Sequence, residues 1–323
     1  MEQPCFRNIP SSVPQSELMA RLRANGPPIP VIVNRQGGTA SRLGRKLISE
    51  ITAAFAESGL CAHVHAVRAA ELADAVSSEN APVVVIGGGD GTLGTAANIL
   101  RRTDQVLGIL PLGTRNHLAR ELGLPLDIPG AARAIAEGAV RRIDLGCAGD
   151  RVFVNNCSVG IYSRLVRERE RRHHLPKWLA TLPAAWHVLR ALDEQHFRLE
   201  WDGTEHRLKS PLLFIGNNRY SLEAGRLGQR DSMADGTLSL AAVEAVQPLQ
   251  LTAMALRLIV GRADPERDFA ALEDVAELTV YGTGLRDVAL DGEVERMHFP
   301  LHVSILPKAL SVIAAPPKAR QPS

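Results

Sequence analysis

The first half of the chain alternates short apolar runs with helical patterns. The β-branched run Val83 to Ile86 is short enough for a strand buried on both faces. A glycine-rich loop follows, and from Thr92 apolar residues recur at helical spacing. The same patterns predict strands at 29–33, 63–67 and 106–110, and helices at 41–58, 69–76, 117–122 and 129–138. Such alternation is typical of parallel βαβ units, whose ligands bind at the carboxyl ends of the strands.

The pattern changes after about residue 145. Short strands between turn signals are predicted at 153–155, 197–201, 212–215, 238–243, 278–281 and 288–290. Asp202-Gly203 is a strong hairpin signal. Many short strands with glycine turns indicate an antiparallel β-sandwich or open barrel, here with a helix expected at 249–260. The final runs, 301–305 and 310–313, are expected to return to the first domain.

We therefore expect two domains. A mobile segment, 1–28, precedes an α/β domain, 29–144, which is completed by about 303–315. A β-rich domain occupies 145–302, and a disordered tail occupies 316–323.

The loop after Ile86 carries the first chemical signal. Gly87, Gly88, Gly89 and Gly91 surround Asp90. Without Cβ atoms, the loop lets backbone N–H groups approach a ligand, and the following helix adds its positive dipole end. An anion such as phosphate is favoured there. No Gly-Lys-Ser/Thr closes the loop, so it is not a Walker A loop.

The loop also contains a G-x-G-x-x-G pattern, from Gly89 to Gly94, which raises a dinucleotide-binding interpretation. That interpretation requires an acid at the end of the next strand. The strand at 106–110 instead runs into Pro111-Leu112-Gly113-Thr114-Arg115-Asn116, which has no carboxylate. A second Gly-Thr turn with Asn116 stands in that place, as if two successive strand ends faced one ligand.

These two motifs together resemble the catalytic domain of the diacylglycerol kinase, sphingosine kinase and bacterial lipid kinase family. NAD kinases and phosphofructokinases share only the first motif in similar form. The resemblance covers about residues 28 to 315. It implies an ATP- and Mg²⁺-dependent lipid kinase, with a parallel α/β nucleotide-binding domain followed by an antiparallel β-sandwich domain for the lipid substrate.

In the first domain, the resemblance assigns the nucleotide to Gly87, Gly88, Gly89, Asp90, Gly91, Thr92, Gly113, Thr114 and Asn116. Asp90 would repel phosphate, so it orders the loop or ligates Mg²⁺ through water. Asn34 ends the first strand, where the family usually reads Asn-Pro-x-Ser-Gly. Asn34 and Gly38 fit that pattern, whereas Arg35 and Gly37 depart from it.

In the second domain, Asp291-Gly292-Glu293 matches the Asp-Gly-Glu of similar kinases. There the Asp is the base that accepts the hydroxyl proton, which implies Asp291 as the base with Glu293 beside it. The alternative is a plain hairpin turn, because Asp-Gly favours such turns. Asp235, with Asp231 nearby, resembles the family segment that helps hold a structural Mg²⁺; a plain turn is again the alternative.

Three further segments carry weaker expectations. Asn155 to Gly160 resembles the start of the family's second domain, but Tyr162 stands where many members have an acid. Gly216-Asn217-Asn218 is expected to form a turn that faces the ligand. The basic run Arg164 to Lys177, followed by Trp178, Leu182 and Trp186 on one helix face, is suited to an anionic membrane surface, with a solvated helix as the alternative.

Composition limits the kinds of binding partner and the cellular compartment that we expect. A net charge of +2 argues against a dedicated nucleic-acid binder, and hydrophobic content of 45% is ordinary for a globular protein. The four scattered cysteines read as reduced thiols of a cytosolic protein. No run approaches the roughly 18 apolar residues of a membrane span, and the first residues lack a signal-peptide pattern. We therefore expect a cytoplasmic protein, peripheral to the membrane, which contacts the cytoplasmic membrane surface transiently.

The expected substrate is a lipid alcohol, diacylglycerol-like or sphingoid-like, and a homodimer is left open. Two alternatives compete with the lipid kinase. An NAD kinase shares the first motif, but the second domain lacks the Thr-Pro-Thr-Gly-Ser-Thr type of run that those enzymes use. A non-catalytic nucleotide or lipid sensor is suggested by the departures at Arg35 and Tyr162, and is disfavoured by Asp291 and Glu293.

Overall fold

The computed structural model describes residues 27–36, 40, 44, 46–160, 195–220, 230, 232–243 and 269–315. The chain divides into two compact units. Unit 1 comprises residues 1–143 together with 308–323, and unit 2 comprises residues 144–307. Each unit is described separately below. No helix among the described residues is long and apolar enough to cross a membrane.

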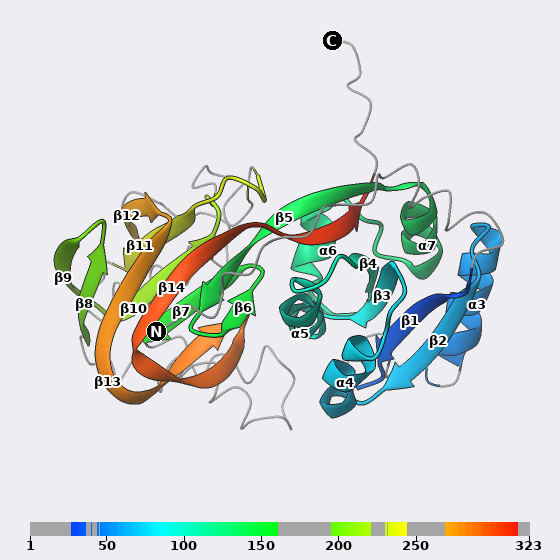
Figure 1. The fold of residues 1–323 in the computed structure, drawn as a ribbon, viewed down its shortest axis with the longest axis horizontal. Coiled ribbons are helices and arrows are strands. Elements are labelled where there is room, and N and C mark those ends of the chain that lie inside the picture. Colours follow the sequence, from blue (N-terminus) through cyan, green and yellow to red (C-terminus); the bar gives the residue numbers. More distant parts are fainter. Residues whose placement is uncertain are drawn as a thin grey trace, which may run out of the picture. The chain divides into compact units, whose positions relative to one another are not determined.

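Unit 1 is built on a parallel sheet, as the alternation of strands and helices predicts. The strands lie in the order β2 (Ala62–Val67), β1 (Ile29–Asn34), β3 (Val83–Gly88) and β4 (Val106–Pro111), as Figure 1 shows. All three neighbouring pairs are parallel. The end of β14 (Glu293–Ala314) pairs in parallel with β4 through Ser311 and Val312, so the C-terminal strand completes this sheet.

Helices cover the strands of unit 1. They are α3 (Lys46–Glu57), the short 3₁₀ helix η1 (Ala69–Glu71), α4 (Leu72–Ser77), α5 (Asp90–Leu100), α6 (His117–Glu121) and α7 (Ile128–Glu137). Helix α3 packs against α7, and α4 packs against α5. Val31 and Val33 join the core cluster that contains α3 and α7, while Ile32 between them is equally buried. The central strands are therefore buried on both faces, which is why they consist of β-branched residues.

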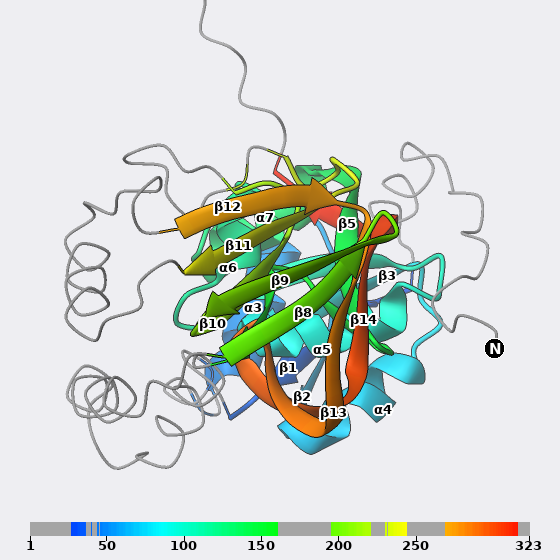
Figure 2. The same ribbon diagram turned by 90° about the vertical axis from the view of Figure 1, so that its left-hand side faces the viewer.

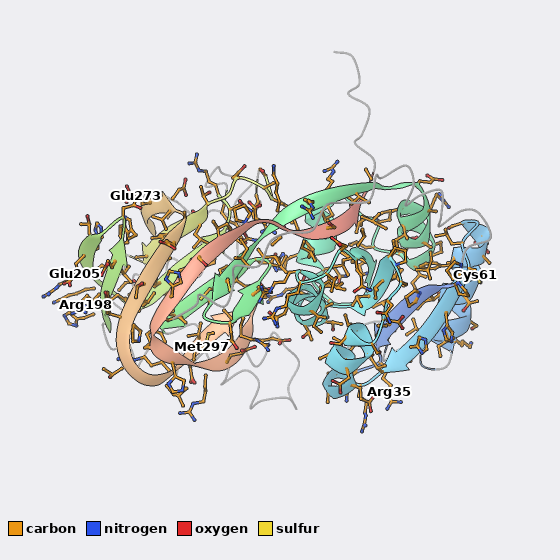
Figure 3. The ribbon with its side chains drawn as sticks, viewed as in Figure 1. Arg35, Cys61, Arg198, Glu205, Glu273 and Met297 are labelled. Carbon is orange, nitrogen blue, oxygen red and sulfur yellow. The ribbon has the colours of Figure 1, made fainter. Side chains whose placement is uncertain are left out.

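Unit 2 is an antiparallel β-rich unit, as predicted. Its strands are β5 (Ala139–Ala148), which enters from unit 1, β6 (Arg151–Phe153), β7 (Asn156–Gly160), β8 (Gln195–Trp201), β9 (Thr204–Ser210), β10 (Leu212–Asn217), β11 (Leu238–Val243), β12 (Phe269–Val275) and β13 (Glu277–Leu290). The main order is β12-β11-β10-β7-β13-β14. The β8–β9 hairpin adds to this sheet through β8 and β13, as Figure 2 shows. Figure 3 labels Arg198 and Glu205 on this hairpin, where they form an exposed ion pair.

The element boundaries differ from the prediction in an informative way. Strand β13 is continuous where two strands are predicted at 278–281 and 288–290, because its register with β14 shifts between Val280 and Gly284 without ending the pairing. β14 likewise joins the two predicted final runs. Strands β5, β7, β9 and β12 have no counterpart among the predicted strands. The helix expected at 249–260, and the segment from Arg164 to Trp186, lie outside the described residues.

Candidate nucleotide site and catalytic aspartate

The two glycine turns of unit 1 lie against each other. Gly89 caps the start of α5, and Gly113 follows β4. A Cβ atom on Gly113 would lie 2.4 Å from the Cα of Gly89, and one on Gly87 would lie 2.9 Å from Cγ2 of Val33. The Gly113 N–H donates to the carbonyl of Gly88 over 3.1 Å. Gly89 and Gly113 are therefore required for close approach of main chain to main chain, and Gly87 leaves room for the Val33 side chain. The contact between Gly89 and Gly113 places both predicted motifs on one surface.

Asn116 holds the second turn in shape. Its backbone is left-handed (φ 51°) and the residue is only 5% exposed. Its Oδ1 accepts from the Gly113 N–H (2.9 Å), and its Nδ2 donates to the Gly113 carbonyl (3.0 Å). The asparagine suits this position because Asn tolerates the left-handed region and can satisfy backbone groups locally. Both polar atoms of its side-chain amide bind the backbone of Gly113, so Asn116 stabilises the conformation of the turn.

Asn34 and Thr92 connect the first strand to the glycine loop. Asn34 ends β1, and its Nδ2 donates to Oγ1 of Thr92 over 3.1 Å. The Asn34 Oδ1 accepts from the backbone N–H of Gln36, which turns the chain away from the strand. Arg35, labelled in Figure 3, is exposed at this turn. Three predicted segments, at Asn34, Gly87–Thr92 and Gly113–Asn116, therefore meet at the carboxyl ends of β1, β3 and β4.

Asp90 is half-buried at the first position of α5. Its Oδ1 accepts a hydrogen bond from the backbone N–H of Leu118 in α6 over 3.3 Å. The carboxylate thus connects the starts of the two helices that follow the two turns. No side chain caps α5, because the N-cap is Gly89, so the first N–H groups and the positive dipole end of this helix are suited to an anion. Thr114 is exposed beside this surface.

Asp291 lies in unit 2, in the two-residue turn that joins β13 to β14. Leu290 pairs with Glu293, and Asp291 and Gly292 both have positive φ, at 49° and 88°. This is the Asp-Gly hairpin turn that the sequence suggests as the alternative to a catalytic role. The carboxylate does more than form a turn. Its Oδ2 accepts from the N–H of Val154 (2.7 Å), and its Oδ1 accepts from those of Asn155 (2.7 Å) and Asn156 (3.1 Å).

The environment of Asp291 changes its acidity. Desolvation raises the pKa of this carboxyl group to about 6, and the three backbone hydrogen bonds together with the charge of Arg230 oppose that rise. The thiol of Cys157 is buried next to this turn, and burial raises its pKa, with a further contribution from Asp291. A carboxyl group with a pKa close to neutrality is suited to exchange protons with a substrate.

The other predicted residues of unit 2 are placed as follows. Glu293 is the first residue of β14 and is exposed. Asp235 is also exposed, and its backbone N–H donates to Oδ1 of Asn218 over 3.0 Å. Asp231 lies outside the described residues. Within the described part of the chain, no three His, Cys, Asp or Glu side chains are grouped to hold a metal ion.

A buried polar cluster that the sequence does not predict surrounds these turns. Asp144 is fully buried, and its Oδ2 accepts from the N–H of Gly236 over 2.7 Å. Asn217 is also fully buried and donates from Nδ2 to the carbonyls of Asp144 (2.9 Å) and Val154 (2.7 Å). Arg230 is 8% exposed among these groups. The sequence predicts a turn facing the ligand at Gly216-Asn217-Asn218, but Gly216 and Asn217 are the last residues of strand β10, and Asn217 and Asn218 are fully buried. The sequence also offers no signal that Asp144 or Arg230 is buried.

Two family models match the chain over most of its length. Residues 28–148 match the diacylglycerol kinase catalytic domain, and residues 155–314 match the YegS C-terminal NAD kinase β-sandwich-like domain. The chain therefore carries a diacylglycerol kinase catalytic domain followed by a YegS-type C-terminal domain. The resemblance inferred from the two glycine motifs is confirmed.

Individual relatives agree with this assignment. The diacylglycerol kinases of Staphylococcus aureus strains JH9 and Newman are each 29% identical over 184 residues, which cover 53% of this chain. The chain spans about half the length of these curated relatives (56%). A crystal structure of a diacylglycerol kinase from Bacillus anthracis str. Sterne shares the fold, with a TM-score of 0.64 at 19% identity, covering 90% of this chain and 97% of that one. A second crystal structure from the same strain gives a TM-score of 0.68 at 23% identity with the same coverage.

Proposed function

We propose that this protein is an ATP- and Mg²⁺-dependent kinase that transfers the γ-phosphoryl group to the hydroxyl of a lipid, diacylglycerol-like or sphingoid-like. The observation that carries the proposal is the contact between Gly89 and Gly113, which brings the two glycine turns onto one surface beside an uncapped helix start. Main-chain N–H groups at such a place suit a triphosphate, since backbone donors and a helix dipole both favour anions.

The residues present fit a nucleotide with Mg²⁺. Phosphoryl transfer depends on positioning and on electrostatic stabilisation, and Mg²⁺ in such sites is bound by one or two carboxylates, phosphate oxygens and water. Asp90 is the carboxylate at the start of α5 and would help to hold the ion. Thr92 and Thr114 offer hydroxyl donors. When bound, Mg²⁺ neutralises charge on the phosphates.

Asp291 is the proposed base. A carboxylate has about four lone-pair sites, and three of those on Asp291 accept backbone N–H groups, so Oδ2 keeps one for an acceptor hydroxyl. Asp291 takes the hydroxyl proton while the acceptor oxygen forms its bond to the γ-phosphorus. The bond from that phosphorus to the β–γ bridging oxygen breaks, and ADP leaves.

The deciding experiment is transfer of label from γ-labelled ATP, with Mg²⁺, to diacylglycerol, a sphingoid base, ceramide, polyprenol or NAD presented separately. Label in a lipid, abolished in Asp291→Asn, supports the proposal. NAD is included because the C-terminal domain is of the NAD kinase β-sandwich-like type. Label in NAD alone would replace the lipid kinase with an NAD kinase. Tight ATP binding without transfer to any acceptor would indicate a sensor.

The proposed activity also implies where in the cell the protein acts. A lipid substrate requires transient contact of the protein with the cytoplasmic membrane surface. Sedimentation with anionic lipid vesicles at low salt, and release at high salt, measures that contact.

A further inference from the structure

Arg230 is a buried cation that binds three oxygen atoms from two segments of unit 2. Its Nη1 donates to the carbonyls of Val154 (2.7 Å) and Asn217 (3.1 Å). Its Nη2 donates to Oδ1 of Asn155 over 3.4 Å. The guanidinium carbon also lies 5.8 Å from the centre of the Tyr220 ring, whose hydroxyl donates to the Asn155 carbonyl over 2.9 Å. The fork of an arginine side chain suits this task, because it presents several donors in fixed directions.

One peptide group joins Arg230 to Asp291. The carbonyl of Val154 accepts from Arg230, and the N–H of Asn155, which belongs to the same peptide group, donates to Oδ1 of Asp291 over 2.7 Å. A cation bound to the oxygen of a peptide group polarises it, which strengthens its N–H as a donor. The positive charge of Arg230 therefore reaches the carboxylate both directly and through a hydrogen-bonded peptide.

The oxygens around Arg230 are of the kind that a hard metal ion binds, namely backbone carbonyls and an amide oxygen. The family resemblance predicts a structural Mg²⁺ in this part of the chain, held by Asp235 with Asp231. The residues described here do not fit that ion. Asp235 is exposed, no described cluster of three acidic, histidine or cysteine side chains exists, and the converging oxygens already bind a guanidinium.

We propose that the guanidinium of Arg230 takes the place of a structural metal ion in unit 2 and acts as the positioning residue for Asp291, by fixing the segment Val154 to Asn156 whose N–H groups hold that carboxylate. The catalytic part of this inference, that Arg230 positions Asp291 for the reaction, rests on the proposed function. The structural half, that these oxygens need a guanidinium and not a metal, stands independently of which substrate is phosphorylated.

The test compares Arg230→Ala and Arg230→Lys with Arg207→Ala. Arg207 is an exposed arginine of the β8–β9 hairpin, paired with Glu205 at 2.7 Å, so its loss controls for removing one positive charge from unit 2. We expect Arg230→Ala to lower kcat by about 100-fold, the scale on which small misplacements of catalytic groups act. KM for ATP should not change. Arg230→Lys should recover only part of the loss, because lysine cannot bridge three acceptors as a planar fork does.

Two further readouts distinguish positioning from simple packing. Because Arg230 lowers the pKa of Asp291, its removal should move the acid limb of the rate profile to higher pH. Millimolar guanidinium should restore activity and thermal stability to Arg230→Ala by occupying the space left, whereas tetramethylammonium at the same concentration should not. The Tm of the wild-type protein without nucleotide should be the same in EDTA and in Mg²⁺.

Each outcome decides the inference. A fall in the wild-type Tm on chelation, or wild-type kcat and an unshifted pH profile in Arg230→Ala, would overturn it. If Arg230→Ala does not fold, recovery of folded protein by guanidinium but not by tetramethylammonium supports it, and equal effects of the two cations overturn it. If the wild type phosphorylates no lipid, the proposed function fails, and the Tm measurements with EDTA and guanidinium still decide the structural half.

Discussion

Asp291 and Asp202 adopt the same backbone conformation in two different hairpins. Each has a φ of 49°, and each precedes a glycine with positive φ in a two-residue turn, between β13 and β14 for Asp291 and between β8 and β9 for Asp202. Their side chains differ. Asp291 is half-buried and accepts three backbone N–H groups, whereas Asp202 is exposed. Both residues therefore form a turn. Of the two, Asp291 is the one whose carboxylate is also held by backbone hydrogen bonds from another segment.

This pair gives the first prediction. Asn-Gly forms the same type of turn as Asp-Gly, so Asp291→Asn and Asp202→Asn should both keep their hairpins. An amide cannot accept the proton, so Asp291→Asn should lower kcat by about 100-fold or more, the usual contribution of a general base. Asp202→Asn should keep wild-type kcat. The measurement is steady-state kinetics with the lipid acceptor, with circular dichroism to confirm that both variants are folded.

Asp291→Asn should also lower the free energy of unfolding. In the wild type, backbone N–H groups donate to both carboxylate oxygens, and the single oxygen of an amide cannot accept from all of them. An unsatisfied, partly buried N–H costs about 1 to 3 kcal/mol. Equal kcat in the two variants, at temperatures where both are folded, would remove Asp291 from the reaction.

The pKa of Asp291 sets the pH dependence of the reaction. A base must be ionised to accept a proton, and desolvation raises the pKa of this carboxyl group to about 6. The rate constant kcat/KM should therefore rise with pH through about 6, where an ordinary aspartate (3.8) would give a limb two units lower. A pH–rate profile in buffers of constant ionic strength measures the limb. A limb near 4 would contradict the desolvated environment described for this turn.

The same pKa fixes the sign of a stability effect. The folded state binds the proton of Asp291 more tightly than the unfolded state, whose pKa is near 3.8. The stabilisation from this carboxyl group is therefore fully present below about pH 4 and is lost as pH rises through about 6. Relative to Asp291→Asn, the wild type should lose unfolding free energy across this window. Parallel urea titrations of the two proteins measure the difference, because the other titrating groups cancel.

The sequence predicts the parts of the fold that local pattern controls. The strand at Val83 and the helix after the glycine loop follow from a β-branched run and from helical spacing, and the Asp-Gly turn at Asp291 follows from dipeptide preference. The continuity of β13 does not follow, because a register shift interrupts the alternation on which a strand prediction depends. Strand β9, Thr204–Ser210, is rich in polar residues, so its membership of the sheet depends on pairing with β8.

The candidate site also contains some residues that the sequence predicts and others that only the tertiary structure reveals. The glycine motifs name the residues of the turns, but the contact between Gly89 and Gly113 is a tertiary fact. Arg230 and Asp144 could not be found from sequence, because arginine and aspartate are usually exposed and their burial depends on partners far along the chain. Such buried charges are visible only once Val154, Asn217 and Gly236 have been placed around them.

Thr92 provides a test of the nucleotide site with a control in the same helix. Thr92 and Thr95 are both half-buried in α5. The Thr92 hydroxyl accepts from Asn34 at the surface of the two turns, while the Thr95 hydroxyl donates to the Gly91 carbonyl (3.2 Å) within the helix. Thr92→Val should weaken ATP binding by about tenfold, which corresponds to the loss of one hydrogen bond to a charged group. Thr95→Val should bind ATP as the wild type does.

Fluorescence titration with a nucleotide analogue measures both affinities in the absence of lipid. This choice keeps the test independent of the acceptor and of unit 2. Equal affinities in Thr92→Val and Thr95→Val would show that the hydroxyl of Thr92 does not face the nucleotide.

The glycine contact predicts an order of stabilities. A Cβ on Gly113 would lie 2.4 Å from the Cα of Gly89, whereas a Cβ on Gly89 would lie 3.3 Å from the Cα of Gly113. The first distance requires the main chain to move, and the second requires a shift of a few tenths of an ångström. Gly113→Ala should therefore lower the unfolding free energy by about 2 kcal/mol or more, within the range for overpacked sites, and Gly89→Ala by less.

Differential scanning calorimetry of the two variants in the absence of nucleotide gives this order directly. ATP affinity should fall in both variants, because the added methyl group of Gly89→Ala also occupies the surface that the phosphates would approach. The two measurements thus separate close packing from ligand contact. A Gly113→Ala protein as stable as the wild type would mean that the turns at Gly89 and Gly113 do not touch, and the single phosphate-binding surface proposed for them would be lost.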